Sequence, residues 1–238
     1  MKKIAIITGG SGSLGLELIK MYLDNNYTVY AIHNSNSITI ENDDLFKYKY
    51  DLENEKEFTI LINDLKKKIT DKSHISFIHA SGIYSKSNIE NFNYEEFNKF
   101  ININTISFLC LYSKLFNVLK KAKLCNIILI SSNLTKRLNK GSLYYVLSKS
   151  MNNQIVKQIA YEHGKYNILA NAIAPGMFLS NMNKDYDTDK FKTIENNIPI
   201  KKLLTATDLA NYIVNFTENN LYVTGEIITI DGGNTLGY

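Results

Sequence analysis

A tyrosine followed four residues later by a lysine places a phenol and an ammonium one helical turn apart on the same face of a helix. Such a pair can move a proton, because a nearby positive charge favours the ionised form of the phenol. The sequence contains three pairs with this spacing: Tyr145 with Lys149, Tyr161 with Lys165, and Tyr186 with Lys190. Since the chain has 16 tyrosines and abundant lysine, roughly two such pairs are expected by chance. The spacing alone therefore does not identify a catalytic pair.

The position along the chain favours Tyr145. Residues 126–131 form an apolar run of strand length, and Ser132 follows it, 13 positions before Tyr145. In the short-chain dehydrogenase/reductase family, which this arrangement resembles, a serine lies at about this interval before the catalytic tyrosine. Tyr161 also has a serine at this interval, but Ser148 lies inside a predicted helix, and the third tyrosine has an isoleucine there. Ligands of open α/β sheets bind outside the carboxyl ends of the strands. We therefore expect Ser132, Tyr145 and Lys149 to share one cleft.

A glycine-rich turn follows the first apolar run of the chain. It reads Thr8-Gly9-Gly10-Ser11-Gly12-Ser13-Leu14-Gly15, and a helical pattern begins within it. Glycines at 10, 12 and 15 match the dinucleotide fingerprint in its strand–turn–helix context. They allow the backbone to approach a pyrophosphate, and the helix N-terminus offers free N–H groups. The alternative is a plain strand-to-helix turn; we favour dinucleotide binding.

Strand-length apolar runs alternate with amphipathic stretches of helix length, which predicts right-handed crossovers in a doubly wound parallel sheet. The predicted strands are Lys3–Thr8, Thr28–Ile32, Phe46–Tyr50, Ile75–His79, Asn126–Ser131, Asn167–Ala172 and Glu226–Ile230. The predicted helices are Leu14–Asp24, Glu53–Ile69, Tyr94–Lys121, Leu143–His163 and Thr207–Thr217. The crossover between strands two and three is abbreviated, and residues 176–204 are long, polar and weakly periodic, as in a mobile substrate loop.

The composition favours one globular α/β domain over residues 1–238. The chain is 45% hydrophobic and 21% charged, with a net charge of +4, and this length can bury one large core. Two cysteines are too few for a disulfide framework, and no apolar run reaches the roughly 18 residues of a membrane span. We expect a cytoplasmic location, no membrane or nucleic-acid partner, and, without clustered His and Cys, no metal site.

These features together resemble the short-chain dehydrogenase/reductase family. Thr8, Gly9 and Gly15 match its glycine motif, although Ser13 stands where the middle glycine belongs. The segment from Asn171 to Gly176 resembles the family's segment after the next strand, and the segments 222–226 and 231–233 resemble its last strand. The resemblance extends from Thr8 to Gly233. It implies a single Rossmann-like domain with seven parallel strands that interconverts carbonyls and alcohols with a nicotinamide cofactor.

The resemblance also implies a role for each catalytic candidate. Tyr145 exchanges a proton with the substrate oxygen, and Ser132 holds the same oxygen by a hydrogen bond. Lys149 holds the ribose hydroxyls and, with the oxidised nicotinamide, lowers the pKa of Tyr145. Asn104 is the helix-kinking residue that supports a water relay to the lysine, with Asn102 as the rival assignment.

The expected cofactor contacts lie at several strand ends. They are Gly9, Ser11, Gly12, Ser13, Leu14, Gly15, His33, Asn34, Ser35, Asp51, Ala80, Ser81, Gly82, Tyr145, Lys149, Pro175, Gly176, Phe178 and Ser180. After the second strand there is no acid to bind the 2′-hydroxyl of NAD, so we favour NADP(H), while NAD(H) stays possible. Asp51, at the end of the third predicted strand, resembles the aspartate with which the family contacts the adenine. The alternative is that Asp51 is the N-cap of the predicted helix from Glu53. We interpret His79 as a structural residue, and Met177, Phe178, Leu179 and Met182 as pocket lining or ordinary packing.

Within the family, the sequence most resembles the 3-oxoacyl-acyl-carrier-protein reductases. This likeness lies in residues 198–210 and in the Tyr-Val-Thr-Gly strand that follows them. Reductases of sugar or secondary-metabolite ketones share these features. The alternatives are a non-catalytic NADP-sensing module and a nucleotide-sugar epimerase. The two long helices around Tyr94–Lys121 and Leu143–His163 resemble the family's dimer interface. We therefore expect a homodimer or homotetramer that acts on a small carbonyl compound, either free or carried on an acyl carrier.

Overall fold

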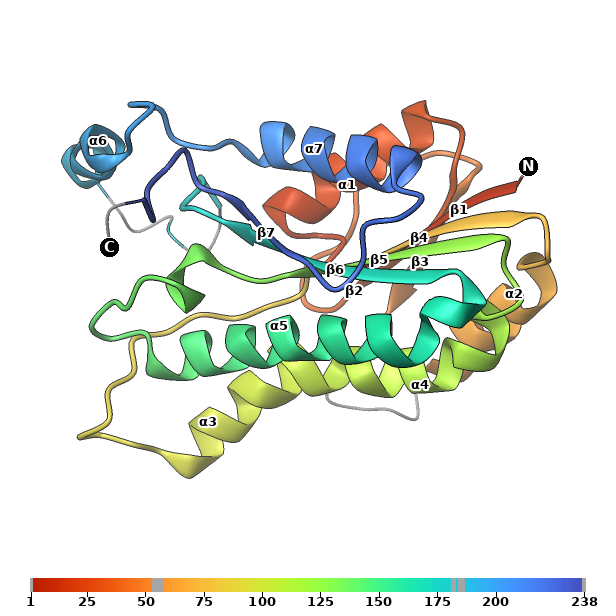
Figure 1. Ribbon diagram of the computed structural model, residues 1–238, viewed down its shortest axis with the longest axis horizontal. Helices are drawn as coiled ribbons and strands as arrows, with labels where there is room; N and C mark the ends of the chain where they lie inside the picture. The colour runs from red at the N-terminus through yellow and green to blue at the C-terminus, as the bar shows by residue number, and fades with distance from the viewer. Residues whose placement is uncertain (1, 53–57, 181–182, 184–186, 237–238) are drawn as a thin grey trace.

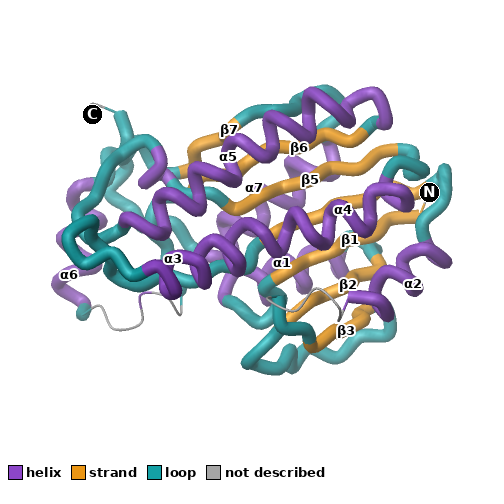
Figure 2. Tube along the Cα trace, turned by 90° about the horizontal axis from the view of Figure 1, so that it is seen from below, coloured by secondary structure: helices purple, strands orange, loops and turns teal. Residues whose placement is uncertain are grey.

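The computed structural model describes residues 2–52, 58–180, 183 and 187–236. Seven parallel strands form one sheet in the order β3-β2-β1-β4-β5-β6-β7 (Figures 1 and 2). The strands are β1 Lys2–Thr8, β2 Thr28–His33, β3 Leu45–Lys49, β4 Ser73–His79, β5 Leu124–Ile130, β6 Ile168–Pro175 and β7 Ile227–Ile230. This order confirms the predicted doubly wound α/β fold and all seven predicted strands.

Helices cover both faces of the sheet (Figure 1). They are α1 Ser13–Asp24, α2 Thr59–Lys68, α3 Tyr94–Ile101, α4 Ser107–Leu119, α5 Leu143–His163, α6 Thr188–Asn197 and α7 Ala206–Asn219. Helices α1 and α7 pack on one face, and α2, α4 and α5 pack on the other. Among the described residues, we find no helix with both the length and the apolar character that crossing a membrane requires.

The apolar strands explain this two-sided architecture. In β1, Ile4 and Ile6 join the core beneath α2, α4 and α5, whereas Ala5 and Ile7 join the core beneath α1 and α7. Successive strand residues point to opposite faces, so a strand that is apolar at every position must be covered on both sides. Each fully buried isoleucine contributes roughly 1.5–3 kcal/mol to folding.

The register brings the carboxyl ends of the strands to one edge. Thr8, the last residue of β1, pairs with Ile32 of β2 and with His79, the last residue of β4. Likewise, Ile130 at the end of β5 pairs with Ile173 of β6. The segments that follow β1, β2, β4, β5 and β6 therefore emerge side by side, which is where a doubly wound sheet binds its ligands.

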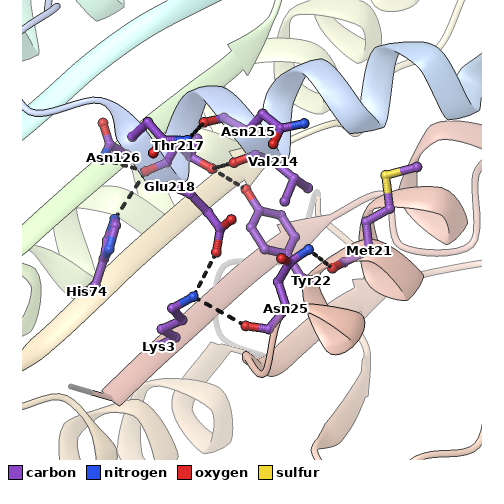
Figure 3. Close-up of polar contacts among 11 residues, drawn as sticks. Lys3, Met21, Tyr22, Asn25, His74, Asn126, Val214, Asn215, Thr217 and Glu218 are labelled. Atoms are coloured by element: carbon purple, nitrogen blue, oxygen red, sulfur yellow. Dashed lines mark hydrogen bonds and ion pairs between the residues drawn. The ribbon is translucent and has the colours of Figure 1, made fainter.

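A polar network fastens α7 to the opposite edge of the sheet (Figure 3). The Lys3 ammonium lies 2.8 Å from a Glu218 carboxylate oxygen. The backbone carbonyl of Thr217 accepts a hydrogen bond from His74 Nε2 at 3.2 Å, and the Tyr22 hydroxyl lies 2.8 Å from Thr217 Oγ1. Buried polar groups need such partners, so this edge is structural.

Two helical predictions need correction. The single helix expected over Tyr94–Lys121 is interrupted by a π-helical segment at Asn102–Ile106 between α3 and α4. The stretch 176–204 contains a helix, α6, whose N-terminus is capped where the Asp187 side chain accepts a hydrogen bond from Lys190 N at 2.7 Å. The predicted helix from Glu53 begins at Thr59 within the described residues, and 53–57 lie outside them. No helix occupies the crossover between β2 and β3, as predicted.

Candidate active site

A cavity of about 1,220 Å³ lies at the carboxyl edge of the sheet. It is lined by residues from the glycine turn, the ends of β2, β3 and β4, the segment after β5, the start of α5 and the segment after β6. Every cofactor contact expected from the sequence, from Gly9 to Ser180, is among the lining residues, together with Ser132. Asn104 is not among them.

The glycine turn leaves no room for side chains. Gly9 has a φ of +72°, and a Cβ atom there would lie 2.8 Å from the backbone nitrogen of Ser81. A Cβ atom on Gly15 would lie 2.1 Å from the Gly9 carbonyl oxygen. Helix α1 begins beside this turn with no side-chain cap and no acid in its first turn. Its free N–H groups can therefore receive an anion, and Ser13, in place of the expected glycine, lies in that first turn.

The end of β2 presents polar, uncharged side chains to the cavity. His33, Asn34, Ser35 and Asn36 all line it, and His33 Nδ1 is buried without a hydrogen-bond partner among the described residues. A buried polar atom without a partner is uncommon, so it is available to a ligand. The carboxylate at this end of the cavity is that of Asp51, which is exposed and follows β3.

Ser132, Tyr145 and Lys149 meet in the same cavity. Ser132 lies two residues after Ile130, the end of β5, and Tyr145 and Lys149 lie in the first two turns of α5. Lys149 is 3% exposed, and its ammonium donates a hydrogen bond to the Ile130 carbonyl at 2.8 Å. Its Nζ atom lies 5.6 Å from the centroid of the Tyr145 ring. The ring of Tyr84 packs edge-on against Tyr145 at 5.4 Å.

Burial governs the ionisation of this pair. It raises the pKa of Tyr145 to about 12, with a hydrogen bond to Ser132 acting in the opposite direction and the Tyr84 hydroxyl adding to the rise. Burial also lowers the pKa of Lys149 to about 8. In the protein without a cofactor, the cost of removing the phenolate from water dominates. The expectation that Lys149, together with the oxidised nicotinamide, lowers this pKa stays a prediction for the cofactor-bound site.

The other two Tyr–Lys pairs are placed differently. Tyr161 is 89% exposed and does not line the cavity. Ser148, its serine at the matching interval, is fully buried, donates to the Tyr145 carbonyl at 2.8 Å and accepts from Asn104 Nδ2 at 3.0 Å. Tyr186 lies outside the described residues. Among the described candidates, only Tyr145 reaches the cleft, as its position in the sequence predicts.

The π-helical segment holds Asn104 inside the protein, whereas Asn102 is exposed. The Asn104 carbonyl accepts hydrogen bonds from Asn152 Nδ2 at 3.1 Å and from His79 Nε2 at 3.3 Å. His79 therefore carries its proton on Nε2, and its Nδ1 accepts from the Thr8 hydroxyl at 2.8 Å. These hydrogen bonds hold the π-helical segment against β4 and α5, and the water relay expected at Asn104 stays a prediction.

Several lining residues could not be identified from the sequence. Asn183 holds the segment after β6 in place, since its side chain donates to the Phe178 carbonyl at 2.7 Å and accepts from Ser180 N at 3.0 Å. Tyr84 and Arg137 reach the cavity from loops whose sequences carry no motif. Of the apolar cluster after β6, Met177 and Phe178 line the cavity, Leu179 is exposed and does not line it, and Met182 lies outside the described residues.

The fold and this cleft together define a dinucleotide-binding oxidoreductase domain. Comparison with known proteins agrees, because the model of the family described as enoyl-(acyl carrier protein) reductase matches residues 14–235. The chain belongs to the short-chain dehydrogenase/reductase family, whose members act on CH–OH and C=O groups with nicotinamide cofactors.

The similar proteins differ in substrate. A 3α-hydroxysteroid dehydrogenase from Mediterraneibacter gnavus is 28% identical over 97% of this chain and 96% of its own length. A 3-oxoacyl-(acyl-carrier-protein) reductase from Buchnera aphidicola is 27% identical over 98% of this chain and 97% of its own length. Among solved structures, ElxO with NADP bound has a TM-score of 0.87 at 26% sequence identity. The match covers 98% of this chain and 99% of ElxO. A short-chain dehydrogenase from Leptospira borgpetersenii with bound NAD⁺ has a TM-score of 0.87 at 25% sequence identity. The match covers 99% of this chain and 94% of that protein.

Proposed function

We propose that the protein is an NADP(H)-dependent carbonyl reductase, reversible as an alcohol dehydrogenase, with Ser132, Tyr145 and Lys149 as its catalytic residues. The observation that carries this proposal is their convergence on one cavity that also contains the glycine turn and the uncapped start of α1. Family membership supports the reaction class.

The fit of the dinucleotide rests on this chain's own atoms. The glycine turn, where Cβ atoms at Gly9 and Gly15 would collide with backbone, would take the pyrophosphate, with the N–H groups at the start of α1 as donors. Lys149 would hold the ribose hydroxyls. The segment from Pro175 to Ser180, fixed by Asn183, would face the nicotinamide. When bound, the cofactor supplies the hydride for reduction or accepts it for oxidation.

The three catalytic side chains handle the oxygen of the substrate. In reduction, Ser132 donates a hydrogen bond to the carbonyl oxygen as negative charge develops there, and Tyr145 gives that oxygen its proton. Because the pKa of Tyr145 is raised to about 12, the phenol is protonated at neutral pH and ready to donate. The Lys149 ammonium, 5.6 Å from the ring centroid, then lies close enough to stabilise the tyrosinate that results. His79 and Asn104 act through packing of the π-helical segment.

The residues after β2 favour NADP(H) over NAD(H). The segment from His33 to Asn36 contains no carboxylate to repel a 2′-phosphate. His33 Nδ1 is buried without a partner among the described residues, and an Nδ1–H group there would be a donor for such a phosphate. ElxO, a structural neighbour, holds NADP, whereas the Leptospira neighbour holds NAD⁺.

The proposal is tested by following NADPH oxidation, at its absorbance band, with a panel of β-keto thioesters, diketones, quinones and ketoses. Turnover with any of these supports a reductase, and the preferred one separates a 3-oxoacyl thioester substrate from a sugar or secondary-metabolite ketone. Cofactor binding without turnover of any member would instead support a non-catalytic NADP-sensing module. The presence of all three catalytic side chains in the cavity favours the enzyme.

A further inference from the structure

The segment after β4 places a second phenol beside Tyr145. Tyr84 is half-buried and lines the cavity. Its ring packs against the Tyr145 ring with centroids 5.4 Å apart and planes at 87°, an edge-to-face arrangement that aromatic pairs favour. Among the described residues, Tyr84 is the one aromatic ring in contact with Tyr145. It therefore restricts the directions in which the Tyr145 ring can turn.

The backbone next to Tyr84 is fixed by the fully buried side chain of Asn104. Asn104 Oδ1 accepts a hydrogen bond from Ile83 N at 2.7 Å, and Asn104 Nδ2 donates one to the Ile83 carbonyl at 3.2 Å. One amide thus binds both backbone polar groups of the residue before Tyr84. A shift of this segment would leave these groups unpaired, which costs free energy, so the ring of Tyr84 projects from a fixed backbone.

The same amide is connected to the helix that carries Tyr145. Asn104 Nδ2 donates to the Ser148 hydroxyl at 3.0 Å, and this hydroxyl donates to the Tyr145 carbonyl at 2.8 Å. At the tip of its side chain, the Tyr84 hydroxyl lies 3.4 Å from Oγ of Ser142, the buried residue directly before α5. The two tyrosines are therefore held in one frame, through the backbone on both sides and through the hydroxyl of Tyr84.

We propose that Tyr84 is a positioning residue for proton transfer by Tyr145. Its ring holds the phenol in the orientation that directs the hydroxyl, beside Ser132, at the substrate oxygen. Proton transfer needs donor and acceptor within about 2.6–3.2 Å of each other, and a displacement of about 1 Å can cost about a hundredfold in rate. Without the Tyr84 ring, Tyr145 can turn about its side-chain bonds and spends less time in the reactive orientation. This inference rests on the proposed function, because Tyr84 acts through Tyr145.

Substitutions separate the ring of Tyr84 from its hydroxyl. NADPH oxidation with the best ketone is measured at saturating NADPH for Tyr84→Ala, Tyr84→Leu and Tyr84→Phe, and NADPH binding is measured by fluorescence. We expect kcat to fall about tenfold or more in Tyr84→Ala and at least about threefold in Tyr84→Leu, with NADPH affinity retained. Tyr84→Phe keeps the ring contact and should retain at least about half of the wild-type kcat. If Tyr84→Ala does not fold, as judged by thermal unfolding, Tyr84→Leu decides.

The division between kcat and KM distinguishes positioning from contact with the substrate. Tyr84 lines the cavity, so it could instead bind the substrate directly. Binding that is equal in the ground state and the transition state changes KM and leaves kcat unchanged, whereas an effect on the orientation of the proton donor lowers kcat.

Phe92 offers a matched control on the same helix. Its ring packs edge-on against Tyr144, the neighbour of Tyr145 in α5, with centroids 5.7 Å apart and planes at 89°, and Phe92 does not line the cavity. Phe92→Ala removes an equivalent ring contact from the adjacent tyrosine, so it should turn over like the wild type.

Several results would overturn the positioning role while leaving the reductase proposal intact. They are a wild-type kcat in Tyr84→Leu, a rise in KM alone, or a Tyr84→Phe variant as impaired as Tyr84→Leu. A loss in Phe92→Ala as large as that in Tyr84→Leu would also overturn it, because the effect would then belong to α5 as a whole. If the wild-type protein reduces no member of the ketone panel, the proposed function fails, and this inference fails with it.

Discussion

The Lys149 ammonium makes a pH dependence that can be worked out from its surroundings. Burial lowers the pKa of Lys149 to about 8, and the proposed mechanism uses its charge beside the cofactor ribose and Tyr145. The sign follows directly, because activity requires the protonated form and is lost as pH rises through that value. About 90% of the side chains are charged at pH 7 and about 10% at pH 9, so we expect roughly a tenfold fall in rate between them.

The assay is kcat/KM for NADPH, measured from pH 6 to pH 10, since this constant reports ionisations of the free enzyme. The matched variant is Lys149→Arg, whose guanidinium stays charged throughout this range. Whatever its absolute rate, its profile should lose the decline centred near pH 8. A wild-type profile that stays flat to pH 10, or an arginine variant with the same decline, would refute the reasoning from Lys149.

Three further predictions follow from particular side chains. NADPH should bind more tightly than NADH in fluorescence titrations, and His33→Asp should reverse the order; equal affinities in the wild type would contradict the assignment of the segment after β2. Ser132→Ala should lower kcat far more than Ser148→Ala, because only Ser132 lines the cavity, and the opposite ranking would argue against the site at Tyr145. Burial lowers the pKa of His79 to about 3 and also lowers that of His74. Protons therefore bind preferentially to the unfolded chain. For His79, the free energy of unfolding should fall by roughly 1.4 kcal/mol per pH unit between about pH 6.5 and about pH 3, and His74 should lower it further in the same direction. In urea titrations, His79→Asn should remove one such increment; an unchanged slope would be inconsistent with a neutral buried ring.

The sequence predicts the sheet well because its signals are local. The buried stretch Ile4–Ile7 of β1, for example, is a continuous apolar run, and the glycine turn carries its own steric demands at Gly9 and Gly15. The spacing from Ser132 to Tyr145 depends on one strand and one helix start, so it too can be interpreted without the fold.

Features set by distant segments could not be predicted in this way. At Asn104, the family resemblance and not the periodicity indicates a helix kink, because the π-helical turn has partners from β4 and α5, namely His79 and Asn152. The raised pKa of Tyr145 depends on how completely the fold buries it. Helix α6 has no buried residues, so its sequence lacks the apolar stripe that reveals the other helices.

The most direct test of the account removes one oxygen atom, the phenol oxygen of Tyr145. Tyr145→Phe removes the proton donor while keeping the aromatic ring, and Tyr161→Phe makes the same change in a pair with identical spacing that is 89% exposed. Each variant is assayed for NADPH oxidation with the best ketone and for NADPH binding by fluorescence.

The account predicts that Tyr145→Phe loses about a hundredfold or more in kcat, the scale of positioned proton transfer, with NADPH affinity largely retained. Tyr161→Phe should turn over like the wild type. Near-normal turnover by Tyr145→Phe, or a comparable loss in Tyr161→Phe, would contradict the assignment of proton transfer to the phenol in the cleft.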